Sequence, residues 1–566
     1  MAMIVCNNEP RHGETSRDEA MNDPDRTQFG PSGYELINEP TLPALVSEWA
    51  QVSPERGFLD PVGGAPRTFG QVHEAGNRWA SAHAGAGVAR EDLVLSMLRP
   101  GSVAVEHWLG AARAGAIDVG VNTDLIGTAL HYVLRDTGAR VAVLEPDYLD
   151  RFAALPDLAE LALIVVAGDV PPEAASLPCS VVTMEAHLAA ADADAAPAEQ
   201  PARHDIACII YTSGTTGSPK GVMMPWGQFS ALLPEQWQSG AEHEAQYVPF
   251  PFYHVAGRMT IHLMARLGGR AVLRQQFSLS AFWDDIQRHN CTMVLLAGAI
   301  PQMLLGAKRP EHADNPLRRV IMAPVIEAHE EFTSAFGADI VTGYNMTETS
   351  LPFYQPDGVK DWRSCGRLRD GFPYYEVRLV DENDQEVPTG QVGELMVRTG
   401  VPWTLNAGYF GKPEATVRAW RNGWFHTGDA FRRDGEGRYY FVDRMTDSIR
   451  RRGENISSAD IEAAALNVEP VVECAAIGVP SPLGEQDIKI VVRLRQGAGL
   501  TEAELLDGLS RALPRFMVPR YAECVPDFPR TEATHRIRKT ALRANWQNGR
   551  VWDGECGDWL PEAPAS

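Results

Sequence analysis

The amino-acid sequence predicts an α/β protein with a large N-terminal domain, made of two doubly wound sheets and a small β barrel, and a small α+β C-terminal domain. Short apolar runs alternate with helical segments in two successive series, which is typical of parallel sheets covered on both faces. Short strands separated by turn residues fill residues 365–443, and a smaller mixed segment follows residue 444. A length of 566 residues also exceeds one compact domain.

The elements follow in order along the chain. Residues 1–38 are polar and aperiodic and are expected to form a flexible tail. The spacing of apolar residues predicts a helix over 105–116, and an Ala-, Asp- and Pro-rich connector over 186–203 separates the two series. Buried strands are predicted at 139–145, 161–168, 206–212, 292–298, 319–324, 475–482 and 487–495. The predicted divisions are a tail at 1–38, an N-terminal domain at 39–443, a C-terminal domain at 444–545 and a second tail at 546–566.

Composition narrows the classes of partner and compartment. Lysine plus arginine number 51 against 74 acidic residues, a net charge of −23, so nucleic acid and anionic membranes are not expected partners. The eight cysteines form no Cys-x-x-Cys pair or Cys/His cluster, which argues against a zinc site and a disulfide framework. The chain lacks a signal-peptide pattern at its start and a run of 18 apolar residues. A cytoplasmic protein is expected.

The first functional motif follows a predicted buried strand. The strand at 206–211 runs into TSGTTGSPKG (212–221), with five hydroxyl side chains, three glycines and one lysine in ten residues. Glycines let successive N–H groups point at one anion, and the hydroxyls and Lys220 add donors and charge. The spacing differs from a Walker A loop. The motif therefore predicts a phosphate-binding loop of another kind.

With its flanking residues, this loop resembles the signature of adenylate-forming enzymes, which include acyl-CoA synthetases, adenylation domains and beetle luciferases. Further matches follow in the order that the family has them, from about residue 40 to 545. They are GYNMTE (343–348), GELMVRTG (393–400), AGYF (407–410), GWFHTGD (423–429) and DRMTDSIRRRGENISSADIE (443–462). Similar enzymes convert a carboxylate and ATP to an acyl-adenylate, and a thiol, usually that of coenzyme A, then displaces AMP.

The resemblance implies a role for each matching residue. Glu348 would hold Mg²⁺, Thr347 would contact the α-phosphate, and Asp429 would accept both ribose hydroxyls. His254 lies where relatives place a gate between adenylate and thiol tunnel, although a core histidine fits the sequence equally well. The implied catalytic residues are Thr347, Glu348, Arg536 and His254. The implied nucleotide-binding residues are Thr212, Ser213, Gly214, Thr215, Thr216, Gly217, Lys220, Ala323, Pro324, Tyr344, Asn345, Thr347, Asp429 and Arg444.

The C-terminal domain is implied to be mobile, with a hinge at Thr446. A glycine-led hairpin would line the pantetheine tunnel after the domain rotates, although its arginines could equally form a solvated face. The implied tunnel residues are Arg451, Arg452, Gly453 and Glu454. Gly453 suits a thiol arm that passes close to the backbone, because it has no Cβ.

The sequence departs from the family at two places. Ile321 and Met322 replace two glycines of a segment that packs on adenine, so they are expected to crowd or reshape the nucleotide pocket. Near the C-terminus, relatives read Thr-Gly-Lys-Ile, whose lysine bridges carboxylate and α-phosphate, while this chain reads Thr-His-Arg-Ile at 534–537 with one extra residue upstream. Arg536 keeps the charge in a bulkier planar group. In relatives, the thioester-forming step does not use that lysine, so the resemblance implies that this step is intact here.

The leading prediction is therefore an acyl-CoA ligase that works mainly in the thioester-forming step, with adenylation weak or absent. Its cofactors would be ATP or acyl-AMP, coenzyme A and Mg²⁺. Its partners would be an apolar carboxylic acid and, if adenylation is absent, a separate adenylating enzyme; the oligomeric state is open. The alternatives are a conventional two-step synthetase, loading of a carrier-protein thiol, and a binding protein without turnover. Nothing in the sequence indicates light emission.

Overall fold

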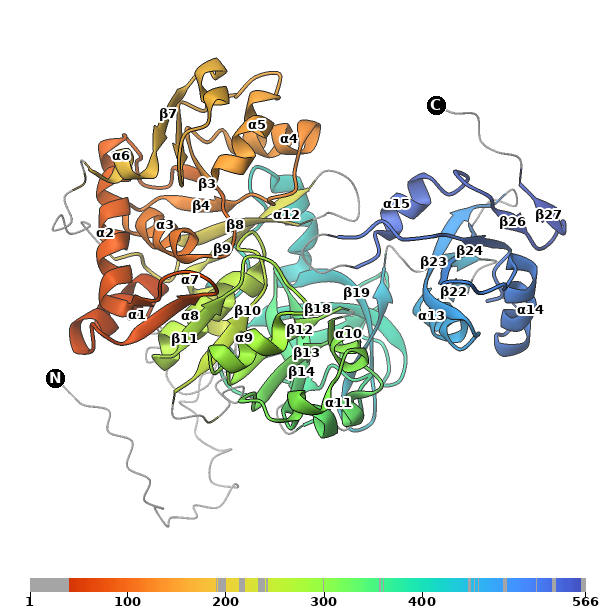
Figure 1. Cartoon of the computed structure of the whole chain (residues 1–566). Helices are drawn as coiled ribbons and strands as arrows, with labels where there is room; N and C mark the ends of the chain where they lie inside the picture. Colours follow the sequence, from red (N-terminus) through yellow and green to blue (C-terminus); the bar gives the residue numbers. More distant parts are fainter. Residues whose placement is uncertain are drawn as a thin grey trace, which may run out of the picture.

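A computed structural model of the chain (Figure 1) shows a large N-terminal domain and a smaller C-terminal domain, drawn in blue. The structure describes residues 40–189, 191, 200–212, 219–232, 240, 243–298, 300–355, 358–359, 361–445, 449–451, 454–456, 458–481, 486–515, 517–531 and 536–560. The tail predicted at 1–38 lies outside these residues. No helix within them is both long and apolar enough to cross a membrane.

The first large sheet has seven strands and is parallel except for its last strand, β9. Its predicted strands are confirmed within two residues at each end. In spatial order it contains β7 (Ser180–Thr183), β6 (Leu163–Val166), β5 (Val141–Leu144), β3 (Leu93–Met97), β4 (Ile117–Gly120), β8 (Ile206–Thr212) and β9 (Lys220–Pro225).

The second large sheet has nine strands, and its parallel centre carries the strands predicted at 292–298 and 319–324. The strand predicted at 206–212, which the sequence placed in the same series, belongs instead to the first sheet as β8. The N-terminal strand β1 joins it by pairing in parallel with β11, a neighbour that local sequence does not reveal. In spatial order it contains β16 (Arg367–Leu368), β15 (Ser350–Gln355), β14 (Asp339–Met346), β13 (Arg319–Ala323), β12 (Met293–Ala297), β10 (Ala245–Val248), β11 (Arg270–Leu273), β1 (Gly57–Pro61) and β2 (Arg67–Thr68).

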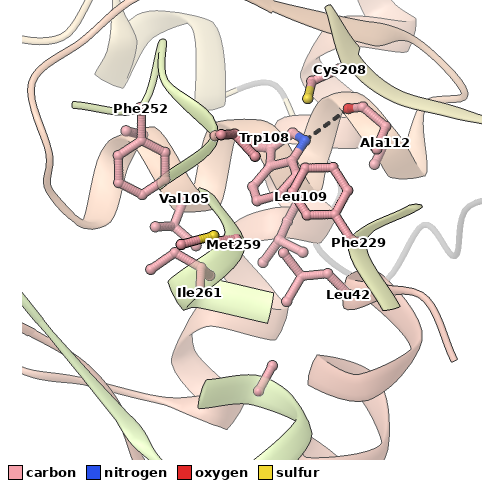
Figure 2. Packing of buried hydrophobic residues seen from close by; sticks show 14 of the residues in the cluster. Leu42, Val105, Trp108, Leu109, Ala112, Cys208, Phe229, Phe252, Met259 and Ile261 are labelled. Carbon is pink, nitrogen blue, oxygen red and sulfur yellow. Dashed lines mark hydrogen bonds between the residues drawn. The ribbon is translucent and has the colours of Figure 1, made fainter. Parts of the chain in front are cut away.

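Helices cover both faces of each sheet. The central core lies between the two sheets and is filled by α1 (Leu42–Val52), α2 (Phe69–Gly85), α3 (Ser102–Arg113), α7 (Trp226–Leu232) and α8 (Val255–Leu267). Figure 2 shows Trp108 of α3 in this core beside Phe252 and Met259. The outer face of the first sheet packs on α4 (Gly127–Thr137) and α5 (Leu149–Ala153), and that of the second on α9 (Phe282–Arg288), α10 (Ile300–Gly306) and α11 (His329–Phe336). The helix predicted at 105–116 is α3.

The region expected to form a small barrel is a four-stranded antiparallel sheet. Its core includes Tyr344 and Phe353 of the second large sheet, so the two sheets share apolar contacts. Its strands, in order, are β17 (Tyr375–Val380), β18 (Val392–Thr399), β19 (Phe425–Arg433) and β20 (Tyr439–Arg444), and α12 (Pro413–Ala419) precedes β19.

The C-terminal domain combines a β hairpin with a five-stranded sheet and three helices. Residues 546–566 were expected to be a tail, but β26 and β27 extend the sheet to Trp559, so that prediction is wrong for these strands. Its elements are β21 (Ile449–Arg451), β22 (Glu454–Ile456), α13 (Ser458–Leu466), β23 (Val471–Pro480), β24 (Gln486–Leu494), α14 (Glu502–Ala512), β25 (Tyr521–Cys524), α15 (Lys539–Ala544), β26 (Trp552–Asp553) and β27 (Asp558–Trp559).

Candidate functional site

Asp429 lies at the centre of a buried polar group where β19 meets β14 and β20. The hydroxyl of Tyr344 donates to its Oδ2 at 2.6 Å, and Nε of Arg444, its cross-strand neighbour, lies 3.5 Å from Oδ1. Burial raises the pKa of Asp429, while the charges of Arg444 and Arg536 and the Tyr344 bond oppose that rise. The carboxylate is thus held rigidly, with one side fixed by a phenol and the other balanced by positive charge.

Glu348 is a second buried carboxylate, in the turn between β14 and β15. Its Oε1 accepts a hydrogen bond of 3.1 Å from the hydroxyl of Tyr409, and its backbone carbonyl accepts two from Asn406, at 3.0 and 2.9 Å. The Nε2 of Gln228 donates to the preceding carbonyl, that of Thr347, at 2.7 Å. These bonds come from segments far away in the sequence and fix the Thr347–Glu348 turn.

Glu348 suits the magnesium ion that the family resemblance implies. Among the residues that the structure describes, no group of three His, Cys, Asp or Glu side chains could hold a metal. Mg²⁺ usually binds through one or two carboxylates plus substrate phosphates and water, so a single oriented glutamate beside a phosphate loop is an adequate set of protein ligands. Burial raises the pKa of Glu348, which the Tyr409 bond partly offsets.

The phosphate loop is described only at its two ends. Residues 213–218, and with them Ser213, Gly214, Thr215, Thr216 and Gly217, lie outside the described residues. Thr212 ends β8 and pairs with Lys220 at the start of β9, so both flanking strands direct the loop to one edge of the sheet. The ammonium of Lys220 lies 4.9 Å from the ring centroid of Tyr409, the residue that also holds Glu348.

His254 caps the N-terminus of α8, where its Nδ1 accepts the backbone N–H of Ala256 at 3.1 Å. Burial, reinforced by the positive charge of Arg536, lowers the pKa of His254 to about 4. The ring is therefore neutral near pH 7, and because Nδ1 accepts, the proton is on Nε2. His254 offers the site a hydrogen-bond donor.

Arg536 acts electrostatically on this same site. Although part of its side chain remains exposed, the protein around it lowers the pKa of Arg536, as does the charge of Arg444, while Asp429 and Tyr344 raise it. The N–H of Thr531 donates to the carbonyl of Arg536 at 2.7 Å, and the N–H of Arg536 donates to the hydroxyl of Thr531 at 3.0 Å. These two bonds close the loop that presents Arg536. Residues 532–535, including the substituted His535, lie outside the described residues.

The segment expected to meet adenine differs from the sequence expectation. Ile321 and Met322 lie on opposite faces of β13, and both side chains are buried in the apolar cores on its two sides. They therefore do not line the nucleotide pocket, and the expectation that they crowd it is wrong in this arrangement. Ala323 and Pro324 follow at the end of the strand, joined by a cis peptide bond. Asn345, after Tyr344, is exposed.

Among the predicted tunnel residues, the structure describes the side chain of Arg451. Arg451 is buried within the small domain, where its Nη1 donates to the carbonyl of Val518 at 2.8 Å and its Nε lies 3.4 Å from Asp487. It holds β21 to the domain in this arrangement. Thr446, Arg452 and Gly453 lie outside the described residues, as does the side chain of Glu454.

Lys539, three residues after Arg536, joins the basic segment 536–539 to the rest of the small domain. Its ammonium lies 2.7 Å from Glu462 and donates to the hydroxyl of Ser458. Both the N–H and the hydroxyl of Ser458 bond Asp443, at 2.9 and 2.5 Å, so Asp443 of β20 caps the first turn of α13. Sequence reasoning missed this network and the Tyr409–Glu348 bond, although Tyr409 stands inside the recognised AGYF motif.

Comparison with protein families gives two matches. The family described as AMP-binding enzyme matches residues 46–410, and its C-terminal domain matches residues 460–534. A crotonobetaine/carnitine–CoA ligase of Citrobacter koseri is 30% identical over 484 residues, covering 83% of this chain and 92% of the relative. The corresponding ligase of Salmonella typhi is 28% identical over 491 residues, with the same coverage of both chains.

Solved structures show the same fold. ATP-bound MatB from Rhodopseudomonas palustris superposes with a TM-score of 0.77 at 24% identity, covering 90% of this chain and 99% of that one. The anthranilate CoA ligase AuaEII, in complex with anthranoyl-AMP, superposes with a TM-score of 0.76 at 23% identity, covering 91% and 98%. The predicted α/β class with a separate C-terminal domain is confirmed.

Proposed function

Since this chain belongs to the AMP-binding enzyme family, as an AMP-forming acid–thiol ligase that works through an acyl-adenylate, we propose that it acts mainly in the second half of that reaction. In this half the thiol sulfur of coenzyme A attacks the acyl carbon, the bond from that carbon to the phosphate oxygen breaks, and AMP leaves. The thiol proton passes to solvent or to the departing phosphate. Adenylation by this chain is proposed to be slow or absent.

One observation carries this proposal: His535 and Arg536 stand where relatives have glycine and lysine. An ammonium is a compact point charge that fits between a carboxylate and a phosphate, whereas a guanidinium is planar and wider. The charge of Arg444 is already present beside Arg536. A second bulky cation there would bring charge to the α-phosphate in an altered geometry, and a misplacement of about 1 Å can lower a rate on the order of 100-fold.

A second candidate is a ligase that performs both halves at comparable rates. It is favoured by the electrostatic coupling of Arg536 to Asp429, Tyr344 and His254, since a residue without a role in adenylation need not reach this site. In that case a separate adenylating enzyme would not be needed to supply acyl-AMP.

The site residues would divide the work between binding and orientation. Asp429, held by Tyr344, would accept the two ribose hydroxyls, and Lys220 would turn from the Tyr409 ring to the phosphates. Mg²⁺ held by Glu348, when bound, would neutralise phosphate charge. His254 would donate from Nε2 toward the reacting acyl group and separate it from the thiol tunnel. Preoriented groups of this kind contribute mainly by positioning and electrostatic stabilisation.

The acid is proposed to be apolar, because PFPFYHVAG (249–257) and LLAGAIP (295–301), which lie in the region where the family resemblance implies the acyl pocket, are rich in apolar residues. The relatives' names point to crotonobetaine and carnitine as acids to include in a screen. Free coenzyme A is the proposed thiol, and a carrier-protein phosphopantetheine is the alternative to exclude by exchanging one acceptor for the other.

Pyrophosphate exchange decides between the two candidates. The chain is incubated with ATP, labelled pyrophosphate and a panel of acids, and separately with coenzyme A and synthetic butanoyl-, octanoyl- and benzoyl-adenylates. We expect thioester from at least one adenylate and exchange at least about 100-fold slower than that step. Exchange as fast as thioester formation would overturn the proposal in favour of the two-step ligase.

Changing Tyr409 to Phe is expected to weaken Mg·ATP binding about 10-fold, because residues that orient a metal ligand commonly contribute 10- to 100-fold to metal affinity. The Tyr409 bond lowers the pKa of Glu348, so its loss raises that pKa further and moves the acid-side loss of Mg·ATP affinity to higher pH. Calorimetric titration across pH 5–8 measures both effects. The control is Tyr440→Phe, whose hydroxyl bonds Asp434 instead; an unshifted pH profile for Tyr409→Phe would contradict the role.

A further inference from the structure

We propose that the buried ion pair of Asp118 and Arg258 positions the loop that carries His254, and thereby sets the rate of the thioester-forming step. Asp118 lies on β4 of the first sheet and Arg258 in the first turn of α8, so the pair joins the sheet to the helix that His254 caps. The inference rests on the role given to His254 in the proposed function. Arg258 would be a positioning residue without contact to substrate.

The guanidinium of Arg258 bonds in two directions at once. Its Nη2 donates to Oδ2 of Asp118, and its Nε donates to the carbonyl of Phe252 at 2.6 Å. The side chains of Arg258 and Asp118 are each 1% exposed. The planar guanidinium of one arginine therefore fixes the position of the loop backbone, two residues before His254, relative to β4.

The loop has no spare room around this guanidinium. A Cβ added at Gly120, the end of β4, would lie 2.8 Å from Nη2 of Arg258 and 2.8 Å from Cα of Tyr253. A Cβ added at Gly257 would lie 2.5 Å from the carbonyl oxygen of Pro251. Real Cβ atoms do not approach so closely, so both glycines are required for the loop to pack directly on the strand and helix.

The guanidinium of Arg258 also packs on an aromatic ring. The guanidinium carbon lies 4.8 Å from the ring centroid of Trp108, which is itself buried in the central core beside Phe252 (Figure 2). Asp118 also lies 3.4 Å from Nδ1 of His107. Because a buried ion pair adds little net stability over apolar residues of the same size, its main contribution here is the geometry that it imposes.

The consequence for His254 is a fixed ring orientation. The Pro251 and His254 carbonyls accept the N–H groups of His254 and Gly257, at 3.2 and 3.1 Å, and the ring accepts from Ala256. Moving the Phe252 carbonyl would turn this short loop as a unit, and with it the direction of Nε2–H. Since donor geometry at a reacting group is sensitive to displacements of about 1 Å, the chemical step should respond before the fold does.

The test compares Arg258→Lys with two other variants, using coenzyme A and the fastest of the three synthetic adenylates. Lysine can reach Asp118 or the Phe252 carbonyl but cannot span both with a planar fork. We expect thioester kcat to fall about 10-fold or more, with AMP affinity within twofold of wild type. Asp118→Asn, which keeps an acceptor for Arg258 and loses the charge, is expected to lower kcat about threefold.

Arg113→Lys is the matched control, since Arg113 is equally buried in α3 and bonds the His73 carbonyl at 2.8 Å and Asn77 at 2.6 Å, away from His254. We expect Arg258→Lys and Arg113→Lys to lower the melting temperature by similar amounts. Arg113→Lys should leave kcat within twofold of wild type. Equal kcat losses in the two variants would overturn the inference.

A double-variant cycle separates this inference from the proposed function. His254→Ala alone should slow the thioester step, and adding Arg258→Lys to it should slow the step by less than a further twofold. If His254→Ala is slow and Arg258→Lys has its full effect in that background, Arg258 acts elsewhere and the inference fails alone. If His254→Ala leaves the thioester step unchanged, the role given to His254 fails and the inference with it.

Discussion

Replacing His535 by glycine and Arg536 by lysine together is expected to raise pyrophosphate exchange about 10-fold or more, with the best acid of a panel. The change returns a compact ammonium and a flexible backbone to the loop that presents charge to the α-phosphate. The charge of Arg536 already acts on Asp429 and Tyr344, so a lysine at this position would bring its charge to the same site.

Thioester formation from a synthetic adenylate serves as the internal control for this double variant and should stay within twofold of wild type. Arg538→Lys is the matched control variant, because Arg538 is an exposed arginine two residues after Arg536. This variant should not alter exchange. If the wild-type protein already exchanges pyrophosphate rapidly and the double variant exchanges at the same rate, Arg536 is adequate for adenylation. A fall in exchange would show that arginine is the better residue in this loop.

Asp429→Ala is expected to weaken AMP binding at least about 100-fold. Hydrogen bonds to charged groups contribute about 1.5–3 kcal/mol each, and two ribose hydroxyls would lose their acceptor. The change also leaves the Tyr344 hydroxyl without its partner and removes the charge that balances Arg444. Both half-reactions should therefore slow, in contrast to the Arg536 variants. Calorimetric titration with AMP measures the affinity directly.

Asp429→Asn separates charge from shape, since the amide oxygen can still accept from one hydroxyl, and an intermediate loss of about 10-fold is expected. Glu382→Ala removes an exposed carboxylate from the turn between β17 and β18 of the same sheet and should leave AMP affinity unchanged. If Asp429→Ala folds and binds AMP within threefold of wild type, Asp429 does not hold the ribose.

Local sequence predicted the strands well, because buried parallel strands are short apolar runs with helices between them. The predicted run at 206–212 is β8 itself, and 319–324 is β13 within one residue. The phosphate loop was also visible locally, since its glycines and hydroxyls are contiguous. The tail expected after 546 was wrong because Trp552 and Trp559 complete a sheet that forms only through tertiary pairing.

Contacts between distant segments were beyond the sequence. Tyr409 and Glu348 are 61 residues apart, and the pairing of residues 406–410 with β9 and with the turn after β14 brings the hydroxyl to the carboxylate. The residue types at 321 and 322 indicated a changed adenine surface, but the alternation of β13 turns both side chains into cores. The sequence left Arg451 either in the pantetheine tunnel or on a solvated face, because charge alone does not reveal a buried partner such as Asp487.

The hydrogen bonds from Ser458 to Asp443, which cap α13, would allow movement of the small domain to be measured in solution. Asp443 precedes the segment proposed as a hinge and Ser458 follows it, so rotation about that segment parts the two residues and exposes the first turn of the helix. The amide hydrogen of Ser458 would then be protected from exchange in the arrangement described here and open after the proposed rotation. Hydrogen–deuterium exchange at this peptide would report which arrangement each substrate favours, without any label or mutation.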